Sequence, residues 1–303
     1  MIQKLFDYIS LEELKECLCN YISRNFMGIC LSSHGTRVIQ KYLDKVYTHT
    51  PIMEEFNMLF YPNLLELIIN QHSTHIIIKY LTLFTNENNE SIVAFLCRHV
   101  QQIATHKHSC CTYQKCVRLV KPNQQKQLLL SIANISDVLF SDQYGNYLAQ
   151  FALEFKIKEI NTIIVTKYFK NFIEYSSQKI ASNVFEKCFE FAEPEIKLQI
   201  IANICTPSMV KQLLFNMYGN YILQKTMIVS DEPYRTMFLQ MVAPLMGLLP
   251  LFPFGNIVIY KLLNAFPELE SMRHQYQSCL TLYYNEYLNL LSLGNAHLSL
   301  QNN

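Results

Sequence analysis

The sequence has few charged residues and almost no net charge. Only 16% of its 303 residues are Asp, Glu, Lys or Arg, and the formal net charge at pH 7 is +1. Bulk positive charge therefore cannot hold a nucleic acid, and such a partner would need a local basic strip. Half of the residues are hydrophobic, which supplies a large core and excludes an intrinsically disordered chain.

The sequence also lacks the residue spacings of metal sites and enzymes. Its ten cysteines include no Cys-x-x-Cys pair; Cys17 and Cys19 are two positions apart, and Cys110 and Cys111 are adjacent. No motif-bearing segment contains a nucleophile with its base or a phosphate-binding loop. We therefore expect no metal, no cofactor and no catalytic role, and the free thiols fit a reducing compartment.

Signals for export or membrane insertion are missing or interrupted. Residues 1–4 lack the apolar core of a signal peptide. Residues 236–260 contain no charge, and a run of this length can span a bilayer. Because Pro244, Pro250 and Pro253 interrupt it, we interpret this run as two buried helices joined by a turn and expect no membrane association.

Glycine is scarce, and its positions reveal a repeat. Four of the seven glycines occupy one position of a short phrase, whose clear copies are residues 34–41, 144–150 and 218–225. Weaker copies are residues 72–79, 108–115, 180–187 and 254–261. The position after the glycine recurs at 36, 74, 110, 146, 182, 220 and 256, a period of 36 to 38 residues. Such a period predicts stacked helical units in one continuous array.

The segments between the phrases favour helices and turns. Apolar residues recur every three or four positions in residues 91–102, 124–132 and 195–204, and turn-forming residues cluster at 86–89, 121–123, 193–195 and 230–233. Residues 278–293 predict a helix that caps the array, followed by a polar tail at 299–303. Residues 1–5 resemble the second half of a phrase, so we expect one domain, 1–298, that starts inside a partial repeat. Our hypothesis is that Met1 is an internal methionine or that the chain is naturally truncated.

The phrase itself predicts the start of a helix with two faces. A glycine such as Gly35 suits a tight entry turn or a close approach between helices. On a helical wheel the polar residues of the first copy share an arc of about 140°, and the apolar residues lie on the other side. The polar set is Thr36, Arg37, Gln40 and Lys41, and the apolar set is Val38, Ile39, Tyr42 and Leu43. Stacking would align the polar faces into one surface.

Three positions of each polar face alternate between two kinds of chemistry. The first and third members are mostly small polar residues with Gln or Glu, which can hydrogen-bond a base edge, and the middle member is often flat and able to stack on a base. A lysine follows in most copies and predicts the missing basic strip. The triplets are Thr36, Arg37, Gln40; Thr74, His75, Ile78; Cys110, Cys111, Gln114; Asn146, Tyr147, Gln150; Ser182, Asn183, Glu186; Asn220, Tyr221, Gln224; and Asn256, Ile257, Tyr260, and the lysines are Lys41, Lys79, Lys115, Lys187, Lys225 and Lys261.

These residues resemble the Pumilio-type (PUF) family of RNA-binding repeat proteins over nearly the whole chain. The most specific parts are the phrase at 218–225 and the Ser182-Asn183-x-x-Glu186 motif, which in that family mark the eighth repeat and the seventh. The resemblance implies an all-α fold, a right-handed, crescent-shaped α-solenoid of about seven three-helix repeats. The partial repeat then corresponds to the second, and the phrase around Gly255 to a terminal pseudo-repeat that caps rather than reads.

The resemblance also implies an RNA sequence, with one base per repeat and the RNA antiparallel to the protein. Asn220 and Gln224 select U with Tyr221 stacking, Ser182 and Glu186 select G, and Asn146 and Gln150 select U with Tyr147 stacking. Cys110 and Gln114 select A, although Cys111 replaces the family's stacking arginine. Thr74 and Ile78 predict weak selectivity, and Thr36 and Gln40 prefer A. The expected site is UGUA, a loose base and a further A.

The function implied by this resemblance is regulation of messenger RNA. We expect a cytoplasmic monomer that binds 3′ untranslated regions and represses translation or promotes decay with protein co-repressors on its convex face. One alternative is a protein-interaction solenoid without an RNA role, against which the seven triplets in register count. The other is a nucleolar PUF-like factor of ribosome assembly, a class that tends to lose the clean triplets.

Overall fold

The computed structural model describes residues 5–84 and 89–275, and all of the regular secondary structure in these ranges is helical. The chain divides into two units, residues 1–170 and 171–303. The predicted cap at 278–293, the tail at 299–303 and the partial phrase at 1–4 lie outside the described residues. The all-α fold predicted from the sequence is confirmed.

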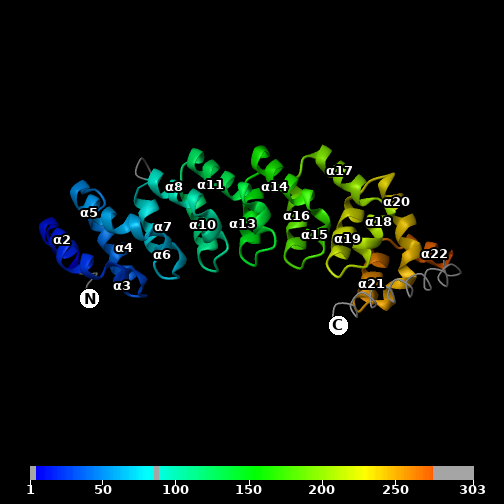
Figure 1. Ribbon diagram of the computed structural model, residues 1–303, viewed down its shortest axis with the longest axis horizontal. Helices are drawn as coiled ribbons and strands as arrows, with labels where there is room; N and C mark the ends of the chain where they lie inside the picture. The colour runs from blue at the N-terminus through cyan, green and yellow to red at the C-terminus, as the bar shows by residue number, and fades with distance from the viewer. Residues whose placement is uncertain (1–4, 85–88, 276–303) are drawn as a thin grey trace, which may run out of the picture. The chain divides into compact units, whose positions relative to one another are not determined.

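The first unit contains successive groups of three helical segments: a first helix, a short second one and a third one that carries the phrase (Figure 1). Some second segments are extended by a 3₁₀ or π turn. Its segments are α2 (Leu11–Cys17), η1 (Leu18–Ile22), η2 (Ser23–Asn25), α3 (Phe26–Leu31), α4 (Gly35–Val46), α5 (Thr50–Phe60), η3 (Tyr61–Asn63), α6 (Leu64–Ile69), α7 (Thr74–Leu83), α8 (Glu90–Arg98), α9 (Val100–Ala104), α10 (Ser109–Leu119), α11 (Pro122–Asn134), α12 (Ser136–Leu139), α13 (Gly145–Leu153) and α14 (Lys158–Lys170).

The second unit continues the same three-helix pattern. It contains α15 (Phe172–Ser176), α16 (Ala181–Phe191), α17 (Pro194–Ile204), α18 (Pro207–Leu214), α19 (Gly219–Val229), α20 (Tyr234–Val242), η5 (Ala243–Leu251), α21 (Gly255–Ala265) and α22 (Glu268–Gln275). The predicted helices at 91–102, 124–132 and 195–204 fall on α8 with α9, on α11 and on α17. Two of the predicted turns, 121–123 and 193–195, contain a proline that begins α11 or α17, a position where proline costs no helix hydrogen bond.

Helices of the same kind pack against each other within each unit. The phrase-bearing helices α4, α7, α10 and α13 pack in sequence, as do the first helices α8, α11 and α14. In the second unit α16 packs on α19, and α19 on α21. Each unit therefore forms its own stack, in which phrases of successive repeats lie next to one another.

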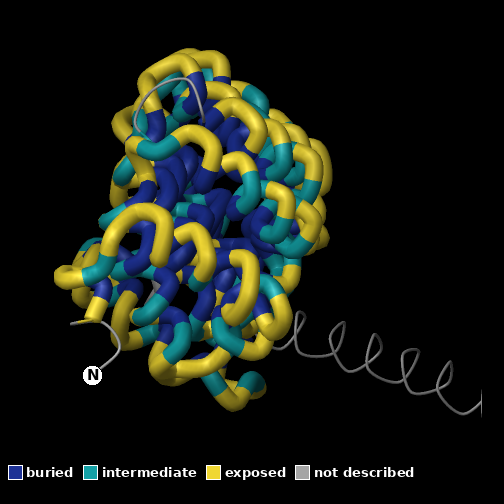
Figure 2. The backbone as a smooth tube through the Cα atoms, turned by 90° about the vertical axis from the view of Figure 1, so that its left-hand side faces the viewer, coloured by how far each residue is buried: buried dark blue, intermediate teal, exposed yellow. Residues whose placement is uncertain are grey.

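Buried residues lie inside each stack and exposed residues lie on its outer turns (Figure 2), and the buried residues are mainly apolar. In the first unit the fully buried rings of Phe56, Phe60 and Tyr80 stack in a row, with centroids 5.6 Å apart for the first pair and 4.8 Å for the second. Full burial of one such side chain contributes about 1.5–3 kcal/mol. The row links α5 and α7, two helices of one repeat.

The uncharged run 236–260 forms three segments rather than the predicted two helices with a turn. It starts in α20, continues through the nine-residue 3₁₀ segment η5 and ends in α21. Pro244 and Pro250 lie in η5, where their missing N–H groups oppose a continuous α-helix. Of the helices that the structure describes, none combines the length and apolar character needed to cross a bilayer.

The small residue of the phrase is required by a close approach between helices. No described glycine has a positive φ, so an entry turn with special dihedrals is not the reason. A Cβ at Gly35 would overlap the carbonyl oxygen of Ile29, six residues earlier in the preceding helix. A Cβ at Gly255 would overlap the carbonyl oxygen of Leu249 in the same way. Where serine replaces glycine, its hydroxyl donates to the equivalent carbonyl, as Ser73 does to Leu67 over 2.7 Å. The second of the two predicted explanations is therefore correct.

A polar side chain three positions before the small residue fixes the start of the phrase helix. Oδ1 of Asp142 accepts hydrogen bonds from the backbone N–H groups of Tyr144 (2.9 Å) and Gly145 (2.6 Å). Asn216 and Asn70 do the same before α19 and α7. Because the first N–H groups of a helix lack internal partners, these caps set the position at which each phrase begins.

Candidate nucleic-acid interface

The predicted site residues all lie in the first two turns of the phrase-bearing helices. Those of α4, α7, α10 and α13 belong to the first unit, and those of α16, α19 and α21 to the second. Because these helices pack side by side within each unit, equivalent positions recur from one helix to the next. The arrangement of the triplets as a ladder therefore holds within each unit.

The first member of most triplets is buried, which corrects the prediction of an open polar face. Five of the seven first members are at most 8% exposed, namely Thr36, Thr74, Cys110, Asn146 and Asn220. The cause is packing of each helix start against its neighbours; Thr36, for example, donates from Oγ1 to the carbonyl of His72 in the following repeat over 3.0 Å. Ser182 is half-buried and Asn256 is exposed, whereas Val38, predicted to be buried, is only half-buried.

Two Asn–Gln pairs show what the buried first member does. The side chain of Asn146 donates from Nδ2 to the carbonyl of Asp142 (2.8 Å) and accepts at Oδ1 from Nε2 of Gln150 (3.0 Å). Asn220 and Gln224 repeat this geometry at 2.8 and 3.0 Å. The asparagine is thus used to hold the glutamine, whose Oε1 and second Nε2 hydrogen are left for a ligand. An amide presented in this way can both accept from and donate to a base edge.

The middle members are exposed, as a stacking role requires. The relative exposure of Tyr147 is 61% and that of Tyr221 is 55%, and Arg37, His75, Cys111 and Asn183 are also exposed. Nζ of Lys261 lies 4.5 Å from the ring centroid of Tyr221 and covers one side of this ring. Exposed flat side chains on a helix provide surfaces on which unpaired bases stack.

The third members differ in what they offer. Gln40, Gln114, Gln150 and Gln224 are half-buried and Glu186 is exposed, so each has polar atoms at the surface. Ile78 is half-buried and has no polar side-chain atom. The structure is therefore consistent with weak selectivity at this repeat.

Cys110 and Cys111 are neighbouring thiols that differ in their exposure to solvent. Their sulfur atoms are 3.9 Å apart, but Cys110 is buried and Cys111 is exposed. Burial is the main cause that raises the pKa of the Cys110 thiol to about 11. Cys110 is therefore protonated at neutral pH and acts at most as a weak donor.

The predicted basic strip is largely neutralised by carboxylates that sequence reasoning missed. Nζ of Lys41 lies 3.0 Å from Oδ1 of Asp7, and Lys79 pairs with Asp44. The two aspartates occupy the same position of successive repeats, and each precedes the repeat of its lysine. Lys187 pairs with Glu190 (3.5 Å) in its own helix, and Lys225 with Glu186 (2.6 Å). The repeated aspartate was the signal available in the sequence. Lys115 is exposed and has no carboxylate partner among the described residues.

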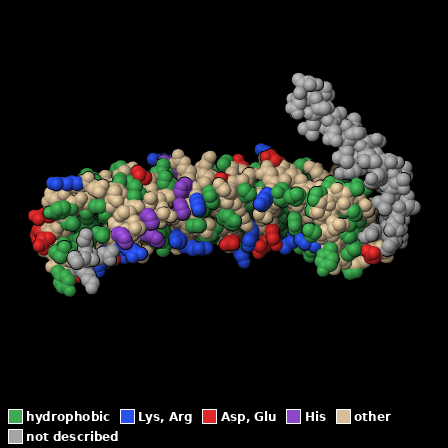
Figure 3. Space-filling model, turned by 90° about the horizontal axis from the view of Figure 1, so that it is seen from below, with side chains coloured by type: hydrophobic (Ala, Val, Ile, Leu, Met, Phe, Trp, Pro, Cys, Tyr) green, Lys and Arg blue, Asp and Glu red, His purple; other side chains and the backbone are tan. Residues whose placement is uncertain are grey.

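Histidines add to this surface and were also missed as a group. His34, His72 and His108 share the first position of the phrase, one or two residues before the start of α4, α7 and α10, and His106 also precedes α10. Histidine side chains gather on the face of the first unit seen in Figure 3. Their shared phrase position was the available signal.

Within residues 5–84 and 89–275, no three His, Cys, Asp or Glu side chains come together in a group that could hold a metal ion. The polar chemistry of the interface therefore rests on amides, one exposed carboxylate, rings and a few cations.

Comparison with known proteins identifies relatives of this arrangement. The profile of the Pumilio-family RNA binding repeat matches residues 1–23, 25–46, 99–133, 141–165, 171–205 and 210–243, more than half of the chain. A Pumilio domain-containing protein of Schizosaccharomyces pombe is 29% identical over 267 residues, which cover 88% of this chain and 39% of that protein. Pumilio homolog 11 of Arabidopsis thaliana is 30% identical over 226 residues, covering 74% of this chain and 40% of that protein. The chain thus spans about two fifths of the length of these relatives.

Solved structures with RNA share the fold. The Puf4 RNA binding domain bound to the HO endonuclease RNA 3′ UTR recognition sequence has 28% sequence identity and a TM-score of 0.71, with 86% of this chain and 83% of that chain covered. PUF-8 in complex with PBE-RNA has 25% identity and a TM-score of 0.67, with coverages of 88% and 78%.

Proposed function

The chain belongs to the Pumilio (PUF) family of RNA-binding repeat proteins, which are not enzymes, and on this basis we propose that it binds single-stranded RNA with one base per repeat. The observation that carries the proposal is the pair of Asn–Gln arrangements, in which a buried asparagine fixes a glutamine beside an exposed tyrosine. Together these residues offer a hydrogen-bonding edge and a stacking surface to the same base.

We further propose that the RNA element is of the UGUA type. Gln224 and Gln150 would each face uracil, the carboxylate of Glu186 would accept from the N–H groups of guanine, and Gln114 would face adenine. Burial of the first members supports a division of labour in which the third member contacts the base and the first member positions it. At the next repeat Ile78 offers no hydrogen bond, so selectivity should fall after the fourth base.

The biological role we propose is cytoplasmic control of messenger RNA. A monomer bound to a 3′ untranslated region would repress translation or promote decay by recruiting other proteins. Two structures of the relative Puf4 contain a 3′ UTR recognition sequence, one from Cox17 RNA and one from HO endonuclease RNA, which supports this class of target.

Selection of bound RNAs from a random single-stranded pool tests the proposal. The selected RNAs should share UGUA with a relaxed fifth position. A pool that remains random after selection, or one enriched for an unrelated motif, would contradict the proposed specificity. The Tyr147→Ala/Tyr221→Ala variant serves as control, because it should select the same motif with weaker recovery.

A further inference from the structure

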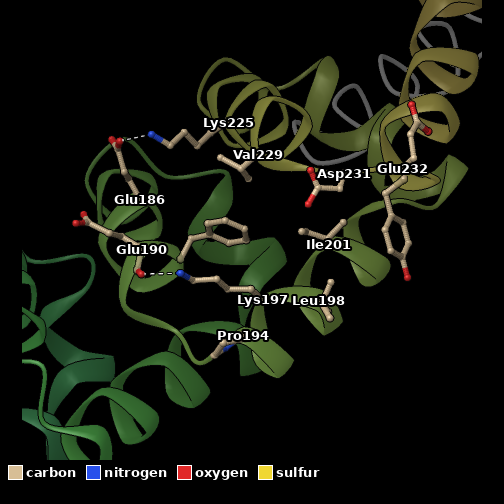
Figure 4. A pocket seen from close by; sticks show the side chains of 12 residues that line it. Glu186, Glu190, Pro194, Lys197, Leu198, Ile201, Lys225, Val229, Asp231 and Glu232 are labelled. Carbon is tan, nitrogen blue, oxygen red and sulfur yellow. Dashed lines mark hydrogen bonds and ion pairs between the residues drawn. The ribbon is translucent and has the colours of Figure 1, made fainter.

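The lysine of one repeat contacts the base-reading carboxylate of the repeat before it. Nζ of Lys225 in α19 lies 2.6 Å from Oε1 of Glu186 in α16, 39 positions earlier in the chain (Figure 4). Both side chains are substantially exposed, Glu186 at 63% and Lys225 at 43%. The pair therefore lies at the surface of the second unit, where RNA can reach it.

This pair differs from the other ion pairs of the phrase lysines. Lys41 and Lys79 reach Asp7 and Asp44, which are not members of any triplet, and these pairs tie each lysine to the segment that precedes its repeat. Lys187 pairs with Glu190 of its own helix. Of these four ion pairs, the one made by Lys225 involves a triplet residue, the carboxylate of Glu186.

Little else holds the Glu186 side chain in place. Next to it lies a cavity of about 670 Å³, whose lining includes Glu186, Lys225, Phe189, Glu190 and Val229. Figure 4 shows the carboxylate of Glu186 directed toward Lys225 at the edge of this cavity. No group of the described residues other than Lys225 donates to the carboxylate, so its second oxygen is available to a ligand.

The RNA itself opposes an unpaired carboxylate. A base held at Glu186 brings its own phosphates near the carboxylate, and like charges repel each other. Lys225 offsets this repulsion and restricts the rotamers of Glu186, so the carboxylate can accept from the N1–H and N2–H groups of guanine. Uracil and adenine do not present this pair of donors.

We infer that Lys225 is a positioning residue for guanine selection: it holds the Glu186 carboxylate in its reading position from the adjacent repeat. This inference rests on the proposed function. It also assigns to the lysine a role that depends on the base, unlike a lysine that contacts only phosphates.

The experiment is a double-mutant cycle read with two RNAs that carry G or U at the second base of the element. Dissociation constants are measured for wild type, Lys225→Met, Glu186→Gln and the double variant. We expect Lys225→Met to reduce the preference for G over U by roughly five- to tenfold, within the range of couplings between contacting side chains. In the Glu186→Gln background the same substitution should leave the ratio unchanged.

Two further variants separate this role from simple electrostatics or misfolding. Lys225→Arg keeps the cation and should restore most of the preference for G. Lys115 holds the same phrase position but has no carboxylate partner among the described residues. Lys115→Met should therefore weaken the binding of both RNAs equally. The circular-dichroism melting curve of Lys225→Met should match that of wild type.

The inference is overturned if Lys225→Met changes the affinity for both RNAs by one factor, if its effect is equal in the two backgrounds, or if it strengthens G binding because the lysine competes with guanine. A wild-type protein that binds RNA without preferring G at this base would overturn the base assignment at Glu186, and this inference with it. Wild type that binds no RNA would instead overturn the proposed function.

Discussion

Gln224 donates a hydrogen bond from Nε2 to Oδ1 of Asn220 over 3.0 Å, and Asn220 is only 2% exposed. The same relationship joins Gln150 and Asn146. A buried amide that is fully used inside the protein cannot be the main contact to a ligand. We therefore propose that the outer glutamine meets the base; the asparagine holds the glutamine in place through this hydrogen bond.

We predict that Asn220→Ala weakens both the fold and the specificity of the site. The substitution removes the donor to the carbonyls of Asn216 and Met217 and releases Gln224. Loss of a buried hydrogen-bonding group costs about 1–3 kcal/mol. The urea midpoint should fall, and discrimination for U at the first base should shrink. Asn256→Ala is the matched control, because Asn256 holds the same phrase position but is exposed, and its effect should stay within about 0.5 kcal/mol.

The exposed tyrosines should contribute to affinity without contributing to stability. Removing a base-stacking ring costs about 1–3 kcal/mol. We therefore expect Tyr147→Ala or Tyr221→Ala to raise the dissociation constant for a UGUA RNA by about 5- to 150-fold while the melting temperature stays close to wild type. Fluorescence anisotropy with a labelled RNA measures the first effect. Tyr260→Ala in the pseudo-repeat, where the ring is 68% exposed, should leave the affinity unchanged, and equal losses at all three positions would contradict the stacking role.

Because helices approach each other closely at the phrase, we predict that alanine substitutions at two glycines have different effects on stability. Gly35→Ala places a methyl group against the backbone carbonyl of Ile29, which cannot move without shifting the helix. We expect a loss of about 1–3 kcal/mol in the free energy of unfolding. Gly28→Ala meets only the side chain of Asn25, which can rotate away, and alanine is the better helix former. The second variant should be neutral or more stable in the same denaturation experiment.

Thiol labelling offers a footprint of the interface at the repeat that we propose to read adenine. Cys111 is exposed there, whereas burial raises the pKa of Cys110 to about 11, so that Cys110 should react slowly at neutral pH. We predict that a UGUA RNA reduces the rate at which a maleimide modifies Cys111, as measured by mass spectrometry. Cys19 is an exposed control outside the triplets; its hydrogen bond to Glu55 raises its pKa and slows its reaction, but RNA should not change the rate. Unchanged labelling of Cys111 at saturating RNA would contradict the predicted RNA path.

The sequence was sufficient to predict the repeats because they depend on local chemistry. A capping residue such as Asp142, a small residue such as Gly145 and a following apolar stripe recur in register, and each acts within a few residues of itself. Where both features are present, as before α7, α13 and α19, they set the start of the phrase helix. The nine-residue 3₁₀ segment η5 was not predicted, because periodicity alone does not distinguish a 3₁₀ helix from a turn beside Pro244 and Pro250.

Burial of the first triplet members could not be predicted from a single helical wheel. Thr36 lies on the polar arc of its own helix, yet it is covered by the following repeat, to which it donates a hydrogen bond at His72. The same limit applies to the basic strip. Whether Lys79 projects into solvent or pairs with Asp44 depends on the rotation between successive helices, which the sequence of one repeat does not specify.

The most direct test of one base per repeat is the Ser182→Asn/Glu186→Gln variant, measured against RNAs that contain UGUA or UUUA. The two substitutions give the repeat of α16 the same Asn and Gln that Asn220 and Gln224 supply in α19, so we predict that the preferred second base changes from G to U. The same ratio of affinities for the two RNAs as in wild type would contradict the proposed register of bases on repeats.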